Sequence, residues 1–146
     1  DGATFTGSFD VGMKMFRDFA NRNYVRPIVL ELGGKNPAIV SRNADLEDAS
    51  TGIVRSAFGL QGQKCSAASR VIVEEPVYDA LIAKLKEKTE KLAIGDPTDR
   101  TTYLGPVINN GSYSDFKNFC EEANGAGGKF LTGGHVKTGG IFDKGF

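Results

Sequence analysis

The 146-residue sequence has no tryptophan, one histidine and two cysteines, and its 18 basic and 18 acidic side chains leave no net charge. Two cysteines far apart build no disulfide framework, so we expect a reducing compartment, the cytoplasm. Because the charges are balanced and form no basic stripe, we expect neither nucleic acid nor a membrane surface as a partner. No apolar run approaches the roughly 20 residues that a transmembrane helix needs.

Metal and serine-hydrolase chemistry also lack their usual residues. His135 is the only histidine, and no Cys or second His stands at a metal-ligand spacing from it, so we expect a surface residue and no metal site. No Gly-x-Ser-x-Gly elbow is present, and a serine-hydrolase triad would have only that histidine to use. The N-terminus begins without methionine and lacks the pattern of a signal peptide.

Helical and strand-like patterns alternate along the chain, which favours a layered α/β fold, and a chain of this length with 40% hydrophobic residues can bury one core of respectable size. We expect strands at 4–6, 27–30, 38–40, 70–74 and 129–131. Helices should follow the first, third and fourth of these strands, and a last helix should end by Gly125. Asp10 is the expected N-cap of the first helix, Asn43 or Asp45 of the second. Cys120 falls on an apolar stripe and is expected in the core.

Cys65 stands in the turn Gln61-Gly62-Gln63-Lys64-Cys65-Ser66, among small and polar residues that can leave its sulfur open to a substrate. Backbone N–H groups in such a turn favour the thiolate, and Lys64 is a candidate for the neighbouring cation. These residues alone leave two interpretations open, a nucleophile or an incidental thiol.

Glu31 closes an apolar strand and precedes Gly33-Gly34, so a partly dry pocket could make it a general base. A strand-end carboxylate in water is the open alternative. Gly7-Ser8 and Gly12 put small residues at a strand-to-helix turn, where backbone amides can approach the phosphates of a dinucleotide. The alternative for that segment is an ordinary glycine turn.

Three motifs, read in order, carry a resemblance to a known family. They are Phe5-Thr6-Gly7-Ser8, Glu31-Leu32-Gly33-Gly34-Lys35-Asn36-Pro37 and Gly62-Gln63-Lys64-Cys65. In order and spacing they resemble the aldehyde dehydrogenase superfamily, which places its catalytic glutamate in E-L-G-G-K and its cysteine thirty-odd residues later in G-Q-x-C. The resemblance continues through Gly95-Asp96-Pro97 and Leu104-Gly105-Pro106-Val107-Ile108, so it covers essentially the whole chain.

The resemblance implies an NAD(P)-dependent oxidation of an aldehyde. Thiolate Cys65 would attack the carbonyl, its own backbone N–H would help to hold the oxyanion, and hydride would pass to the nicotinamide. Water deprotonated by Glu31 would then hydrolyse the thioester to a carboxylic acid. The residues implied along the NAD or NADP cofactor are Gly7, Ser8, Val11, Gly12 and the backbone of Leu32.

Members of this family are much longer than 146 residues, so the resemblance implies a fragment of their α/β fold. Residues 1–32 would be the C-terminal end of a Rossmann-like NAD(P)-binding domain. Residues 33–146 would be the first part of the catalytic, cysteine-bearing α/β domain. We expect the oxyanion-hole Asn upstream, a homo-oligomer for the full-length protein, exposed apolar surface on the fragment, and no activity from the fragment alone.

The cysteine turn resembles most the branch that oxidises glutamate semialdehyde, the 1-pyrroline-5-carboxylate dehydrogenases of proline catabolism. In that branch the Ser after the nucleophile helps to bind the substrate carboxylate, a role that the resemblance carries to Ser66. Leu32, where that branch has Met, gives the general form of the family motif. The alternatives are a general aldehyde or succinate-semialdehyde-type dehydrogenase, a non-catalytic relative, and a thiol esterase that uses Cys65 without a cofactor.

Overall fold

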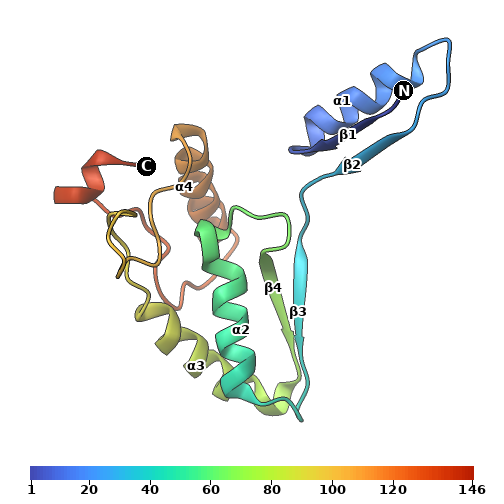
Figure 1. The fold of residues 1–146 in the computed structure, drawn as a ribbon. Helices are drawn as coiled ribbons and strands as arrows, with labels where there is room; N and C mark the ends of the chain where they lie inside the picture. Colours follow the sequence, from blue (N-terminus) through green and yellow to red (C-terminus); the bar gives the residue numbers. More distant parts are fainter.

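The computed structural model describes all 146 residues and confirms the α/β class, with two βαβ units joined by a short extended link (Figure 1). The main elements, in chain order, are β1 (Ala3–Thr6), α1 (Phe9–Ala20), β2 (Ile28–Glu31), β3 (Asn36–Val40), α2 (Leu46–Phe58), β4 (Ala68–Val73), α3 (Tyr78–Glu90) and α4 (Asn110–Gly125). Short 3-10 segments lie at Gly59–Gly62, Glu75–Val77 and Gly140–Lys144.

In the first unit, β1 and β2 pair in parallel, from Ala3 opposite Ile28 to Thr6 opposite Glu31. Helix α1 connects them, and its N-cap is Ser8, whose hydroxyl accepts the N–H of Val11 at 3.4 Å. The prediction of Asp10 as the cap was wrong. A cap residue needs extended backbone, which Ser8 has (φ −68°, ψ 150°), whereas Asp10 already lies in the first helical turn.

In the second unit, β3 and β4 pair in parallel and α2 connects them. Asp45 caps α2, accepting the N–H groups of Glu47 and Asp48 at 2.7 and 3.1 Å, which confirms one of the two predicted caps. Helix α3 packs along α2, and the buried core of the chain lies between these helices and the sheet. Its centre is formed by Val40, Ile53 and Leu81.

An ion-pair cluster also joins α2 to α3. The carboxylate of Glu47 lies 2.7 Å from the ammonium of Lys84 and 2.5 Å from that of Lys88. Hydrogen bonds from these two lysines lower the pKa of Glu47 from 4.5 to about 2. The Glu47 carboxylate is solvent-exposed, so water and salt weaken the attraction.

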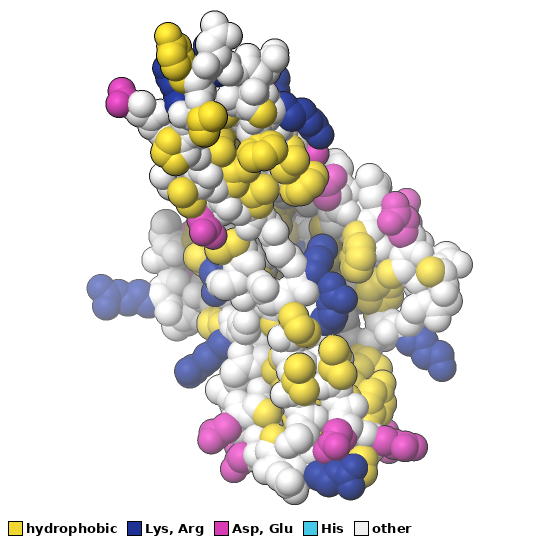
Figure 2. Space-filling view, turned by 90° about the vertical axis from the view of Figure 1, so that its right-hand side faces the viewer, with side chains coloured by type: hydrophobic (Ala, Val, Ile, Leu, Met, Phe, Trp, Pro, Cys, Tyr) yellow, Lys and Arg dark blue, Asp and Glu magenta, His cyan; other side chains and the backbone are white.

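The core is small, since only seven of the 146 residues are buried. Each sheet has two strands, and apolar side chains such as Val29, Ile39 and Ile72 remain more than half exposed on the strands. Figure 2 shows apolar side chains gathered over the upper part of the molecule, where β1, α1 and β2 lie. The expected exposed apolar surface is thus present, and it is typical of sheets made to be covered on both faces.

The region after α3 follows the predictions in part. Residues 95–109 form a loop with one isolated bridge between Ile94 and Leu104, and Cys120 on α4 is buried, as predicted. The predicted strand at 129–131 was wrong, because a strand needs a partner and this segment pairs with none. None of the helices combines the length and the apolar character that crossing a membrane requires.

Candidate active site

Glu31 is the last residue of β2 and is exposed. Its carbonyl accepts the backbone N–H of Gly7 at 3.1 Å, which ties the ends of β1 and β2 together. The expectation of a partly dry pocket around the carboxylate was wrong for this chain. Alternate residues of β2 face opposite sides, and Glu31 shares its side with the exposed Val29 rather than with the half-buried Leu30.

The predicted cofactor residues meet at the carboxyl edge of the β1–β2 sheet. Gly7 and Ser8 turn the chain from β1 into α1, and Leu32 follows β2 at the same edge. Gly12 is the buried residue of α1, and a Cβ there would lie 2.5 Å from a terminal carbon of Leu32. The structure therefore brings these residues together and shows a packing reason for Gly12.

This edge fits a dinucleotide in its physical chemistry. Ligands of α/β sheets bind beyond the carboxyl ends of parallel strands, and a helix N-terminus offers free backbone N–H groups to phosphate. Helix α1 begins at that edge behind Ser8. Val11, about half exposed, adds an apolar surface beside it.

The cysteine turn follows an abrupt end of α2. Three consecutive residues, Leu60, Gln61 and Gly62, have positive φ angles of 53°, 58° and 70°. Only glycine adopts this region freely, so Leu60 and Gln61 are strained, a condition that recurs at functional sites. A Cβ at Gly62 would also lie 2.9 Å from the carbonyl oxygen of Ala57. The helix is thereby broken, and Cys65 stands exposed beyond the break.

Local hydrogen bonds then hold the turn. The N–H of Lys64 donates to the carbonyl of Gly62 at 2.9 Å, and the N–H of Ala67 donates to the carbonyl of Lys64 at 3.2 Å. The side-chain oxygen of Gln63 accepts the N–H of Ile108 at 3.1 Å, which fastens the turn to the long loop. A Cβ built at Gly59 would lie 3.4 Å from the ammonium of Lys64, so this cation lies beside the C-cap of α2.

Asn36 links the cysteine turn to the segment that carries Glu31. The side-chain amide of Asn36 donates to the carbonyl of Cys65 at 2.7 Å, across 29 residues of sequence. A Cβ built at Gly34 would lie 3.4 Å from the same carbonyl. The two segments expected to hold base and nucleophile are therefore in direct contact.

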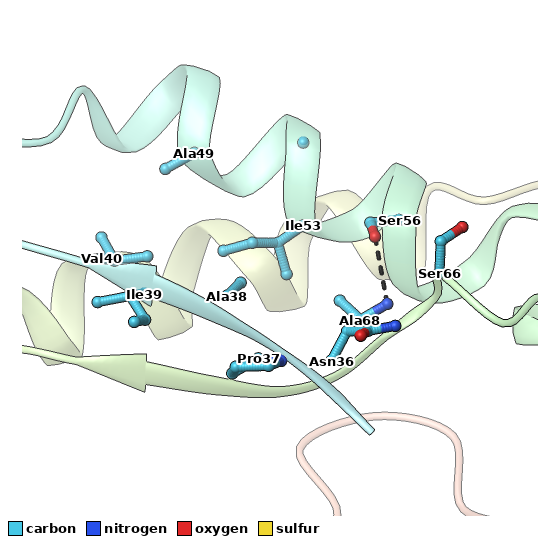
Figure 3. Close-up of a pocket in the computed structure, with 11 residues that line it drawn as sticks. Asn36, Pro37, Ala38, Ile39, Val40, Ala49, Ile53, Ser56, Ser66 and Ala68 are labelled. Atoms are coloured by element: carbon cyan, nitrogen blue, oxygen red, sulfur yellow. Dashed lines mark hydrogen bonds between the residues drawn. The ribbon is translucent and has the colours of Figure 1, made fainter. Parts of the chain in front are cut away.

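Ser66 lies at one end of a hollow between α2 and β3, and Asn36 lines it as well (Figure 3). Inside the hollow the walls are apolar, with Ala38, Val40 and Ile53 among them. The hydroxyl of Ser56 accepts the N–H of Ala68 at 3.2 Å and so fixes the beginning of β4 just after the turn. Ser66 itself is exposed.

His135 is exposed, and its Nδ1 lies 3.0 Å from the carbonyl of Gly133. No group of three His, Cys, Asp or Glu side chains is arranged to hold a metal ion. The residue that sequence reasoning missed is Asn36. Its signal was the parallel pairing of the strands before and after α2, which sets Asn36 opposite Ala68, three residues beyond Cys65.

Comparison with known proteins adds to this geometry. A sequence model of the aldehyde dehydrogenase family matches residues 1–146. The 1-pyrroline-5-carboxylate dehydrogenase of Geobacillus thermodenitrificans is 41% identical to the chain over 135 residues. This match takes in 90% of the chain and 26% of the relative, so the chain spans about a quarter of that relative's length.

Solved structures are similar in fold over nearly the whole chain. A 1-pyrroline-5-carboxylate dehydrogenase from Thermus with bound NAD has a TM-score of 0.86 and 32% identity, covering 95% of this chain and 27% of that one. A 3,6-anhydro-L-galactose dehydrogenase in complex with NADP has a TM-score of 0.93 and 36% identity, covering 98% and 30%. Both relatives therefore share the arrangement of strands and helices described above.

Proposed function

This chain belongs to the aldehyde dehydrogenase family, and we propose that the intact protein oxidises an aldehyde to a carboxylic acid with NAD(P)+. The observation that carries the proposal is the contact between the segment after Glu31 and the cysteine turn, made by the 2.7 Å hydrogen bond from Asn36 to Cys65. A base and a nucleophile on touching segments can serve one substrate, and an exposed Cys65 can reach it.

Cys65 is the nucleophile of the proposed reaction. Its thiolate forms a bond to the aldehyde carbon and gives a thiohemiacetal, whose oxyanion the backbone N–H of Cys65 helps to hold. The broken end of α2 supports this role, since it leaves Cys65 exposed in a turn whose backbone is fixed by local hydrogen bonds. The thioester that follows oxidation stays on Cys65 until water reaches it.

Glu31 is the base that activates this water. Its carboxylate takes a proton from water, and the hydroxide attacks the thioester carbon. The bond between that carbon and the sulfur of Cys65 then breaks, which releases the product acid and returns the thiolate. The position of Glu31 supports the assignment, because it ends β2 only five residues before Asn36, whose side chain touches the cysteine turn.

Gly7, Ser8, Val11, Gly12 and Leu32 are the proposed cofactor residues. When bound, NAD(P)+ supplies the acceptor for the hydride of the substrate. The N-terminus of α1 behind Ser8 holds phosphate through backbone N–H groups, and the relative from Thermus, solved with bound NAD, covers 95% of this chain. We assign residues 1–32 to the end of the NAD(P)-binding domain and residues 33–146 to the first part of the catalytic domain.

Glutamate semialdehyde, in equilibrium with 1-pyrroline-5-carboxylate, is the proposed substrate. Relatives of that name are about 40% identical to the chain, and Ser66 offers a hydroxyl beside the nucleophile for the substrate carboxylate. A general aldehyde dehydrogenase is the second candidate, favoured by Leu32 in the general form of the glutamate motif. Since Cys65 must remain a free thiol to react, we also infer a reducing compartment, the cytoplasm.

Initial rates of NADH and NADPH formation by the intact protein test the proposal. The panel should include 1-pyrroline-5-carboxylate, succinate semialdehyde and an uncharged aldehyde of similar length. The highest kcat/KM for 1-pyrroline-5-carboxylate supports function and substrate together. A higher value for another aldehyde overturns the substrate only, and no oxidation of any aldehyde overturns the function.

A further inference from the structure

Asn36 occupies an irregular point at the start of the second sheet. It pairs with Ala68, whereas the next residue, Pro37, pairs with Arg70, so the register shifts between them. Proline has no N–H to donate to the sheet, and such a residue is typical of bulges. Figure 3 shows Asn36 beside Ala68 at the amino ends of both strands.

The irregular backbone leaves the side chain of Asn36 directed at the cysteine turn. Its amide donates to the carbonyl of Cys65 at 2.7 Å, and this contact lies at an exposed position. Fixing that carbonyl constrains the peptide plane between Cys65 and Ser66, and with it the backbone positions from which the sulfur and the Ser66 hydroxyl extend. The bond is therefore placed to orient reacting groups.

Because this contact is exposed, its effect on the orientation of the cysteine turn differs from its effect on the folding free energy. Water can replace an exposed hydrogen bond, so its loss costs little folding free energy. Water cannot restore the direction of a side chain, and a displacement of about 1 Å can cost about 100-fold in rate. Removing the bond should thus change catalysis far more than folding.

We propose that Asn36 is a positioning residue that holds the Cys65 turn in register with the segment carrying Glu31. The expected loss of kcat rests on the proposed aldehyde oxidation. The expected loosening of the cysteine turn rests on the structure alone. Asn36 acts through Cys65 and touches no reacting atom.

The test compares the intact wild-type protein with Asn36→Asp, which keeps the shape and removes the donor, and with Asn36→Ala. The matched control is Ser69→Ala, which removes a weaker bond of 3.4 Å from the Ser69 hydroxyl to the carbonyl of Asn36 and leaves the contact with Cys65. Alkylation of the buried Cys120 by iodoacetamide reports any general unfolding.

We expect kcat for aldehyde oxidation to fall about 10- to 100-fold in both Asn36 variants. KM for NAD+ should stay within about twofold, because the proposed cofactor residues lie in or directly after the first βαβ unit, whereas Asn36 begins the second. Amide hydrogen exchange in residues 62–67 should become at least about tenfold faster, with exchange in α2 and α3 unchanged. Ser69→Ala should match the wild type in every measurement.

Unchanged exchange in residues 62–67 together with unchanged kcat in Asn36→Asp would overturn the proposal. Rapid alkylation of Cys120 in both variants would overturn it too, since Asn36 would then serve the fold. If the wild type oxidises no aldehyde, the proposed function is overturned, but the link between Asn36 and Cys65 is not. Faster exchange confined to the turn would still support the link between Asn36 and Cys65 in that case.

Discussion

The side-chain amide of Asn36 donates a 2.7 Å hydrogen bond to the carbonyl of Cys65, 29 residues further along the chain. This bond joins the first residue of β3 to the turn that follows α2. Glu31 ends the strand before that link, so the predicted base and the predicted nucleophile belong to segments that touch.

Cys65→Ala is expected to reduce aldehyde oxidation by the intact protein to background, because Cys65 is the proposed nucleophile and alanine cannot form the thioester. The matched variant is Cys120→Ala, which removes the buried thiol of α4 and should cost about 1 kcal/mol of stability with kcat retained. Initial-rate assays and thermal melts of both variants check this. Equal loss of activity in the two variants would deny Cys65 a special role.

Gly62→Ala is expected to destabilise the protein. The positive φ of 70° costs about 1–2 kcal/mol for an L side chain, and the new Cβ would press on the carbonyl of Ala57. Gly52→Ala on α2 is the control, because no atom lies within 4 Å of its Cβ position and alanine favours helix by about 0.5–1 kcal/mol. Urea unfolding should show midpoints moved in opposite directions, and a neutral Gly62→Ala would contradict the described turn.

The folded state is expected to become less stable as the pH decreases, because protonation of Glu47 removes its ion pairs with Lys84 and Lys88. Lys84 and Lys88 hold the folded pKa of Glu47 at about 2, below its ordinary 4.5, so the favourable contribution is complete above about pH 5 and is lost as pH falls toward 2. Glu47→Gln should lower Tm at pH 7 and lower it less at pH 3. Glu121→Gln on α4 is the control. Equal effects of Glu47→Gln at both pH values would contradict the cluster.

Ser66→Ala is expected to lower kcat/KM for 1-pyrroline-5-carboxylate by at least about tenfold, because a hydrogen bond to a carboxylate contributes about 1.5–3 kcal/mol. An uncharged aldehyde should lose less than about threefold, since it has no carboxylate to bind. Paired initial-rate measurements with the two substrates check the difference. Equal losses would remove Ser66 from substrate recognition.

Apolar spacing in the sequence predicted most of the helices and strands, since each face of an element must be apolar where it packs. The small and polar neighbours of Cys65 predicted that it is exposed, because they cannot form an apolar core around it. Single caps were harder to predict. Ser8 and Asp10 are both good caps in type, and only the backbone angles at Ser8 decide between them.

Contacts between distant segments account for what the sequence did not reveal. Leu60 and Gln61 have left-handed backbone angles, which leucine and glutamine rarely adopt, so no local rule predicts this conformation. The register shift after Asn36 depends on how β3 meets β4, and the bond to Cys65 depends on that shift. The exposure of Glu31 likewise depends on what packs against β2.

The measurement that tests the account most directly is mass analysis of Cys65 in intact Glu31→Gln protein given NAD+ and aldehyde. Without its base, thioester hydrolysis should slow by about 10²- to 10⁴-fold, so one burst of NADH should precede a slow steady rate. The peptide containing Cys65 should then carry the acyl group, and Cys120 should remain unmodified. Full turnover without a burst, or an acyl group found on another residue, would contradict the assignment of Cys65 and Glu31.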